Sequence, residues 1–139
     1  MASTLIDAGP LIALFAEHEP HSARYHALLQ RAATERIRLC TTWPCVVEAS
    51  HFLAPARRHM LLNWVAQGGV SVFPFQQESL IDFVKLMARY TEEPRTEMDL
   101  ADASLVWLAE ETGVTAIMTT DRRDFSRYRL ADGRAFEIL

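Results

Sequence analysis

The chemistry that this sequence could support is concentrated in its carboxylates. The most informative ones come from four separate segments of the chain: Asp7, Glu48, Asp102 and Asp121. Carboxylates held close together repel one another and raise one another's pKa, so such a cluster is suited to binding hard divalent cations. We expect Mg²⁺ or Mn²⁺, because no set of Cys and His residues has the spacing of a tetrahedral zinc site.

Asp7 and Asp121 directly follow predicted strands. The apolar run Thr4–Ile6 ends at Asp7, and the β-rich run from Val114 to Thr119 ends just before Asp121. Each residue also has a purely structural alternative. Asp7 could close a turn before the next helix, and Asp121 could form a polar turn with Asp124. We assign Asp124 to that turn.

Glu48 and Asp102 each lie about one turn inside a predicted helix. Glu48 follows a strand predicted at residues 37–41, and it could equally be an ordinary solvated helix residue. Asp99 and Asp102 have the spacing of a helix capping box, although with Asp in place of the usual Glu at the second position. Each acid taken alone is weak evidence, and the placement of all of them together is the stronger indication.

Predicted strands and helices alternate along the whole chain. The strands are expected at residues 4–6, 37–41, 70–73 and 114–119, with an edge strand at 135–138, and the helices at 10–15, 20–35, 44–53, 61–68, 80–90 and 99–113. This alternation predicts an α/β fold: a three-layer α/β/α sandwich with a mostly parallel central sheet of four or five strands. Ligands of such sheets bind beyond the carboxyl ends of the strands, where Asp7 and Asp121 are expected.

Composition narrows the class of protein. The chain has 139 residues, half of them hydrophobic, and we expect one domain over residues 1–139. A net charge of −4 argues against a protein that coats nucleic acid without specificity. No apolar run approaches the roughly 18 residues that span a bilayer, so we expect a cytoplasmic protein without a membrane segment. Cys40 and Cys45 are expected to be reduced thiols.

Four segments together resemble a known family. The segment Leu5-Ile6-Asp7-Ala8-Gly9-Pro10-Leu11-Ile12 resembles the opening motif of PIN domains. Val47-Glu48-Ala49 is similar to the second acidic position of the family, residues 99–105 to the third, and residues 118–125 to the fourth. The order and spacing of the motifs over essentially the whole chain resemble the VapC-like toxins of bacterial toxin–antitoxin pairs.

The resemblance implies an endoribonuclease that depends on Mg²⁺ or Mn²⁺ and hydrolyses RNA phosphodiesters with a metal-activated water. It assigns both catalysis and metal binding to Asp7, Glu48, Asp102 and Asp121. Thr119 matches a hydroxyl position that helps to position a carboxylate or water, and Asp99 is a possible supporting group. The resemblance also implies a homodimer and a small antitoxin protein as partner.

Basic residues near the fourth motif are candidates for contacts with RNA. Arg122, Arg123 and Arg127, with Arg129 beside them, follow Asp121 closely and could bind the phosphate backbone. A solvated surface run is the alternative. All but one of the 14 basic residues are arginine, whose planar guanidinium suits phosphate.

Other functions remain as alternatives. Glu48 and His51 form a Glu-x-x-His pair of the kind that binds two irons in helical bundles, but such sites need a second copy. The sequence lacks a Gly-x-Ser-x-Gly motif and a cysteine beside a suitable histidine, which argues against a nucleophilic hydrolase. Within the PIN-like fold, the alternatives are a housekeeping RNA-processing nuclease and a non-catalytic module that binds nucleic acid or protein.

Overall fold

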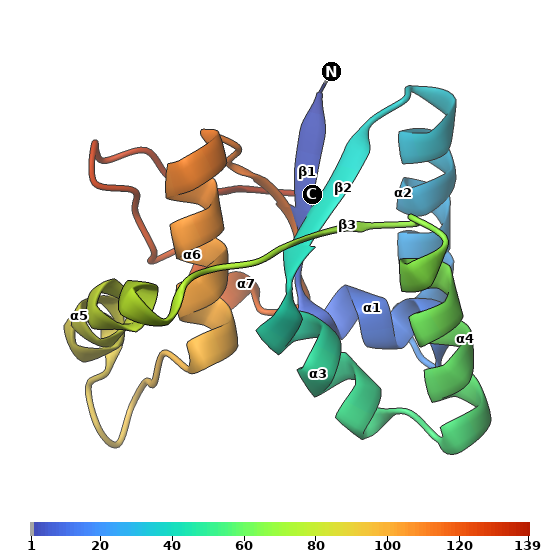
Figure 1. Ribbon diagram of the computed structural model, residues 1–139, viewed down its shortest axis with the longest axis horizontal. Helices are drawn as coiled ribbons and strands as arrows, with labels where there is room; N and C mark the ends of the chain where they lie inside the picture. The colour runs from blue at the N-terminus through green and yellow to red at the C-terminus, as the bar shows by residue number, and fades with distance from the viewer. Residues whose placement is uncertain (1) are drawn as a thin grey trace.

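The computed structural model describes residues 2–139, which form a central parallel sheet with helices on both sides (Figure 1). The strands are β1 (Ser3–Ile6), β2 (Arg38–Thr42), β3 (Ser71–Phe73), β4 (Ala116–Met118) and β5 (Glu137–Ile138). They lie in the order β3-β2-β1-β4-β5, and every pairing of neighbours is parallel. The predicted parallel sheet, including the edge strand near the end of the chain, is confirmed.

The helices form the outer layers. They are α1 (Ala8–Phe15), α2 (Ser22–Thr34), α3 (Trp43–Phe52), α4 (Pro55–Ala66), α5 (Leu80–Tyr90), α6 (Leu100–Thr112) and α7 (Arg122–Phe125), with a 3₁₀ turn at Gln77–Ser79. Figure 1 shows α5 and α6 on one side of the strands and α2 and α4 on the other. The predicted three-layer α/β/α architecture is therefore confirmed.

The order of the strands reverses direction between β1 and β4. From β1 the chain moves outward to β2 and then to β3, after which it returns past β1 to β4 and continues to β5. The connections after β1 and β4 therefore lead to opposite parts of the sheet. Open α/β sheets bind their ligands at such a reversal, outside the carboxyl ends of the strands.

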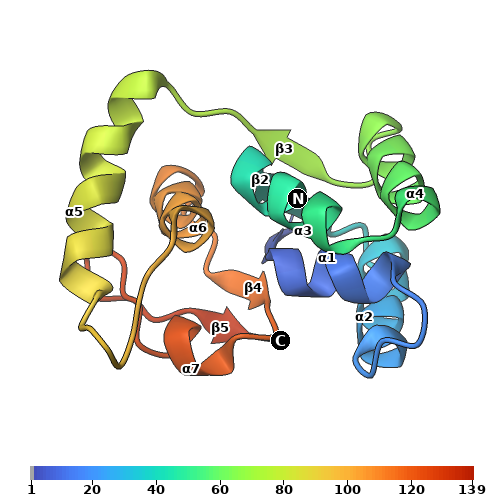
Figure 2. The ribbon, with the colours of Figure 1, turned by 90° about the horizontal axis from the view of Figure 1, so that it is seen from below.

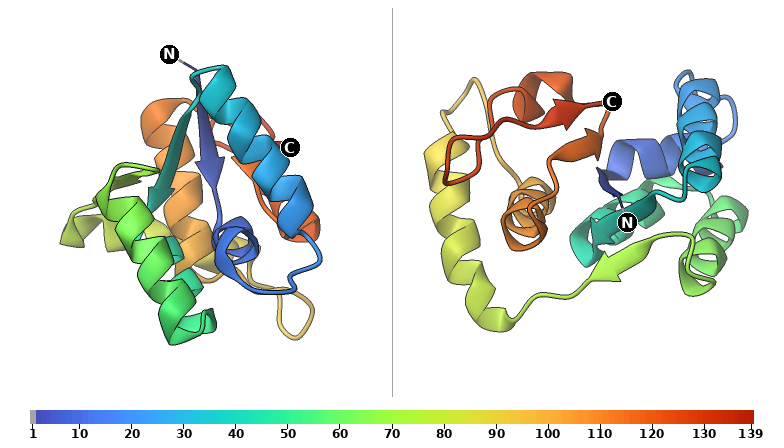
Figure 3. Two further views of the ribbon diagram at one scale, coloured as in Figure 1. Left: turned by 90° about the vertical axis from the view of Figure 1, so that its right-hand side faces the viewer. Right: turned by 90° about the horizontal axis from the view of Figure 1, so that it is seen from above.

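The carboxyl ends of the strands face one end of the molecule. Figure 3 (left) shows β1 and β2 pointing the same way, with α1 beyond the end of β1. Figure 2, which looks at the molecule from that end, shows α1 and α3 next to each other and α6 beside α3. Helix α1, which follows Asp7, thus meets the helices that contain Glu48 and Asp102 at the reversal of strand order.

Helix α6 has more buried residues than any other helix in the described part of the chain, because it packs against both the sheet and α5. Its residues from Ala101 to Val106 are all buried, Asp102 included. The sequence defines both of its ends: the carboxylate of Asp99 accepts a hydrogen bond from the main-chain N–H of Asp102, and Gly113 takes the left-handed conformation with φ of 73°. These two ends agree with the predicted helix at 99–113.

Several bounds differ from the sequence expectations. The strand expected at 114–119 is shorter, Ala116–Met118, the edge strand covers only Glu137–Ile138, and the supposed polar turn after β4 contains the short helix α7. Helix α4 begins at Pro55, a residue suited to the first helical position, instead of at residue 61. Cys40 and Cys45 are free thiols, as expected, and both are buried. Among residues 2–139, no helix is both long and apolar enough to cross a bilayer.

Candidate active site

A cleft of about 260 Å³ opens at the carboxyl ends of β1 and β4. It is lined by Asp7, Ala8, Gly9, Ile12, Glu48, Phe52, Glu97, Asp99, Asp102, Thr120, Asp121 and Asp124. The structure thus brings the four acids singled out in the sequence into one cleft, together with Asp99. Glu97 and Asp124 add carboxylates that the sequence reasoning did not place there.

Asp7 is held by two hydrogen bonds at the start of α1. Its Oδ1 accepts from the main-chain N–H of Ala8 at 2.7 Å, and its Oδ2 accepts from the hydroxyl of Thr119 at 2.8 Å. Burial raises the pKa of Asp7 to about 6, although both hydrogen bonds oppose the rise; the charges of Asp99 and Asp121 add to it. Asp7 is therefore the N-cap residue of α1, and its carboxylate also lines the cleft.

Thr119 links two of the acids. Its hydroxyl donates to Asp7 and accepts from the main-chain N–H of Asp121 at 3.0 Å, and the residue is buried. The main-chain carbonyl of Thr119 accepts from the hydroxyl of buried Tyr25 at 2.9 Å. The hydroxyl position expected from the family resemblance thus contacts a carboxylate.

Asp102 lies in the first turn of α6 and is held at both ends. Its main-chain N–H donates to Oδ1 of Asp99 at 2.8 Å, and its Oδ2 accepts from the hydroxyl of Tyr128 at 2.7 Å. Burial, followed by the charges of Asp7 and Asp99, raises the pKa of Asp102 to about 8. The capping box suggested by the sequence is thus half formed: Asp99 caps the helix, while the carboxylate of Asp102 bonds Tyr128.

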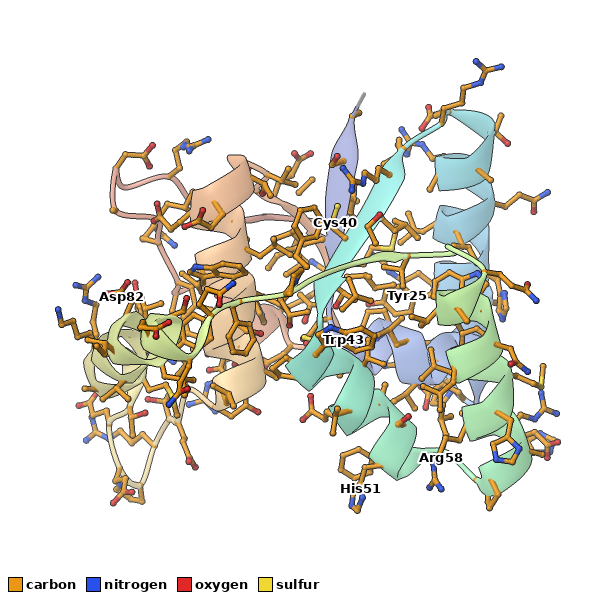
Figure 4. The ribbon with its side chains drawn as sticks, in the orientation of Figure 1. Tyr25, Cys40, Trp43, His51, Arg58 and Asp82 are labelled. Atoms are coloured by element: carbon orange, nitrogen blue, oxygen red, sulfur yellow. The ribbon has the colours of Figure 1, made fainter. Side chains whose placement is uncertain are left out.

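Glu48 enters the cleft from α3 and is half-buried. Burial raises its pKa to about 7, and the charges of Asp99 and Asp7 contribute. His51 is exposed near the end of α3 (Figure 4) and is not among the described residues that line the cleft. The Glu-x-x-His pair therefore does not form a joint site.

Asp121 and Asp124 belong to the start of α7. Oδ1 of Asp121 accepts from the main-chain N–H of Asp124 at 3.1 Å, and burial raises the pKa of Asp121. One carboxylate oxygen from each of Asp102, Asp121 and Asp124 lies within 4.8 Å of the others. Asp124 was expected to belong only to a turn. Its main-chain N–H does bond Asp121 at the start of α7, but its carboxylate also lines the cleft.

The arginines after Asp121 differ from one another in their surroundings. Arg122 and Arg123 are exposed on α7. Arg127 is half-buried, and its guanidinium donates to Oδ1 of Asp124 at 3.1 Å. Arg127 therefore holds an acid of the cleft, whereas Arg122 and Arg123 are free to meet solvent or a ligand.

Gly9 allows α1 to start close to the segment that follows β4. A Cβ atom at Gly9 would overlap the hydroxyl of Thr120, so only glycine fits without moving that side chain. Asp7 and Asp121 flank this contact in sequence. The close approach brings their two segments to the same cleft.

A buried set of polar groups beneath the acids was missed in the sequence. The hydroxyls of Thr42 and Ser104 lie 2.6 Å apart, and Ser104 also donates to the carbonyl of Ala101 at 2.7 Å. The thiol of Cys45 is 4.0 Å from Oδ1 of Asp7. The hydroxyl of Thr42 also lies 3.4 Å from Sγ of Cys45, so these contacts join the end of β2 to both α3 and α6. The available signal was polar residues at the end of an apolar strand.

The donor set fits a hard divalent cation. The ligands on offer are carboxylate oxygens, which Mg²⁺ and Mn²⁺ prefer. Because burial and mutual repulsion raise the pKa values of Asp7, Glu48 and Asp102, the ionised cleft is unfavourable without a positive charge. A bound cation would remove that cost.

Comparison with known proteins points in one direction. The family model of the PIN domain matches residues 4–130. This range contains all the acids that line the cleft. No curated protein matches the chain individually.

Proposed function

Because this chain belongs to the PIN domain family, we propose that it is a metal-dependent endoribonuclease and the toxin of a type II toxin–antitoxin pair. The PIN fold is in general a nuclease fold. The observation that carries the proposal is the meeting of Asp7, Glu48, Asp102 and Asp121 in one cleft at the reversal of strand order. Several buried acids in one cleft are costly for stability, and a functional role accounts for them.

Asp7, Glu48, Asp102 and Asp121 are the residues that would hold Mg²⁺ or Mn²⁺. Such a cation supplies an activated water and offsets negative charge on the oxygens of the phosphodiester. The chain's own contribution is orientation: Thr119 fixes Oδ2 of Asp7, and Asp99 fixes the main chain at Asp102. Arg127 forms an ion pair with Asp124, which restrains that side chain and compensates part of the negative charge at the edge of the cleft.

RNA is the proposed substrate. Arg122 and Arg123 are exposed immediately after Asp121, where their guanidinium groups would contact phosphates of a bound strand. Arg127 was expected to contribute as well, but its guanidinium is occupied by Asp124. We therefore assign backbone contacts to Arg122 and Arg123, and a supporting role to Arg127.

The test is a cleavage assay with purified protein on structured and single-stranded RNAs. Wild-type protein should cleave with Mg²⁺ or Mn²⁺ and stop when EDTA is added, and Asp7→Asn and Asp121→Asn should lose activity by a factor of about 100 or more. Asp82→Asn, on exposed α5 (Figure 4), is the matched control and should cleave like wild type. Cleavage that survives in both site variants would reject the proposal.

The toxin role, as opposed to housekeeping RNA processing, is tested in cells. Production of the wild-type chain alone in a bacterium should arrest growth, and production of Asp7→Asn should not. A small antitoxin made in the same cells should restore growth, and its arginines would pair with the acids of the cleft. Harmless overproduction of an active wild-type enzyme would favour the housekeeping nuclease.

We also propose that the protein works in the cytoplasm as a homodimer. Large apolar side chains are exposed on several helices, among them Trp43 and Val47 of α3 and Ile81 and Val84 of α5. Ile81 and Val84 are each 63% exposed. Exposed apolar groups on neighbouring turns of a helix favour burial against another protein surface.

A further inference from the structure

We propose that Tyr128 is a positioning residue that orients the carboxylate of Asp102 toward a divalent cation, an inference that rests on the proposed function of the cleft. Tyr128 follows α7 by three residues and is fully buried. Its hydroxyl donates to Oδ2 of Asp102 at 2.7 Å. The two residues come from separate segments, so this contact joins α6 to the chain beyond β4.

The bond restrains a torsion that is otherwise loose. The terminal torsion of an aspartate side chain is broad, so packing alone leaves the direction of its oxygens poorly defined. A hydrogen bond to one oxygen fixes the plane of the carboxylate and leaves acceptor capacity on the other. The hydrogen bond from Tyr128 can therefore remain in place while the other oxygen of Asp102 binds a cation.

Tyr128 is itself held rigidly. Its ring packs edge-on against those of Tyr90 and Phe125, with centroid distances of 4.9 Å and 5.0 Å. The preceding residue is also held in place, because the guanidinium of Arg127 donates to Oδ1 of Asp124 at 3.1 Å. A donor on so constrained a ring can define the position of its acceptor.

The contact is not explained by helix capping alone. The main chain at Asp102 is already fixed by Asp99. A fully buried tyrosine hydroxyl needs a hydrogen-bond partner, and a main-chain carbonyl could have served. Here the partner is a carboxylate that lines the cleft. Asp7 has a corresponding donor in Thr119, so both of these buried acids are oriented by a hydroxyl from the β4 end of the chain.

The experiment measures Mn²⁺ binding by isothermal titration calorimetry in the absence of RNA. Tyr128→Phe removes only the hydroxyl and keeps the ring. It should weaken Mn²⁺ binding by about tenfold, the usual effect of removing a group that orients a metal ligand. Tyr90→Phe removes a hydroxyl from the same aromatic cluster that bonds no carboxylate, and it should bind Mn²⁺ like wild type.

A double-mutant comparison separates orientation of Asp102 from general damage. In an Asp102→Asn background, Tyr128→Phe should cause no further loss of Mn²⁺ affinity, because the oriented ligand is gone. A loss that persists there would show that the hydroxyl supports packing instead, and would overturn the inference. Melting temperatures and circular dichroism spectra of every variant verify folding.

The outcomes also separate this inference from the proposed function. If wild type binds Mn²⁺ and Asp102→Asn binds it weakly, but Tyr128→Phe equals wild type, only the role of Tyr128 is overturned. If wild-type protein binds no Mn²⁺, the proposed function fails and the role of Tyr128 fails with it. In the expected case, Tyr128→Phe should also need more Mn²⁺ for half-maximal RNA cleavage and approach the wild-type rate at saturating metal.

Discussion

At the scale of single residues, ionisation of the carboxyl groups in the metal-free cleft is unfavourable. The pKa values of Asp7, Glu48 and Asp102 are raised to about 6, about 7 and about 8, with burial as the largest cause in each case. Near neutral pH the metal-free cleft therefore retains protons that an exposed carboxyl would have lost. A divalent cation that binds there must displace these protons, so its affinity should rise with pH.

The same shifts predict how the stability of the metal-free protein depends on pH. In the unfolded chain these carboxyls have pKa values near 4, below their folded values, so the folded state binds protons more tightly. The stability they contribute is full below about pH 4 and is lost as pH rises through the folded values. With EDTA present, the free energy of unfolding should fall between pH 5 and pH 8.5.

Asp102→Asn isolates one of these contributions. The variant cannot ionise at position 102, so in EDTA it should exceed wild type in stability at pH 8.5 by at least about 1 kcal/mol, and this gain should shrink toward pH 5. Urea unfolding at the two pH values measures both quantities. A constant difference between the proteins at all pH values would contradict the raised pKa of Asp102.

Thr119 offers a test of carboxylate orientation at Asp7. Thr119→Val keeps the shape of the side chain but removes the donor to Asp7 and the acceptor for the main-chain N–H of Asp121. It should cost about 1–3 kcal/mol of stability and weaken Mn²⁺ binding by about tenfold or more. Thr119→Ser retains the hydroxyl and should recover most of both. Equal behaviour of the Val and Ser variants would refute the role of the hydroxyl.

At the scale of helices and strands, Asp99 combines capping with a place in the cleft. Asp99→Ala removes the cap of α6 and should destabilise the protein by about 1 kcal/mol. Asp99→Asn keeps a capping oxygen without the charge, and should retain both stability and RNA cleavage if Asp99 only supports the site. Thermal unfolding and the cleavage assay measure the two effects. A large loss of cleavage in Asp99→Asn would instead make Asp99 a metal ligand.

Most of the long helices could be predicted from the sequence because their patterns are strong, whereas the first half of α4, from Pro55, was missed because it has few apolar residues at helical spacing. Helix α6 has a capping Asp99 and a terminating Gly113, and β1 ends at Ile6, directly before Asp7, as expected. The four residues of α7 are too few to show a helical period, so that segment was interpreted as a turn. β4 is shorter than its β-rich sequence suggested, because its pairings with β1 and β5 involve only residues 116–118.

The acids at strand ends could also be predicted, because the parallel sheet fixes where those ends lie. The contacts of Tyr128 and Asp124 in the cleft could not be predicted. Their contacts depend on how the chain turns after α7, which no local pattern specifies. In hindsight, Phe125 and Tyr128 are apolar residues three apart in an arginine-rich run. That spacing was a sign that one side of the segment is buried.

At the scale of the whole molecule, the cleft exists only when segments far apart in the sequence are brought together by folding. Asp7 and Asp121 follow the adjacent strands β1 and β4, and Glu48 and Asp102 come from helices that lie between strands in sequence. Since the unfolded chain has no such site, Mn²⁺ binding should stabilise the folded state. Cation binding and global stability are therefore linked.

The proposed homodimer can be tested at the same scale. Ile81→Glu places a charge on the exposed apolar face of α5, where it would be buried in a dimer. Light scattering after size exclusion should show a dimer for wild type and a monomer for Ile81→Glu. Gln30→Glu introduces the same charge on the exposed surface of α2, away from the apolar side chains of α3 and α5, and should remain dimeric. A monomeric wild type would contradict the proposal.

The central claim, that the carboxylate cleft holds a divalent cation, is tested most directly by a crystal structure of the protein grown with Mn²⁺. Anomalous scattering locates Mn²⁺ without reference to the protein. The account predicts an anomalous peak in the cleft, bound by oxygens of Asp7 and of at least one other acid among Glu48, Asp102 and Asp121. A cleft that contains no anomalous peak at saturating Mn²⁺ would contradict it.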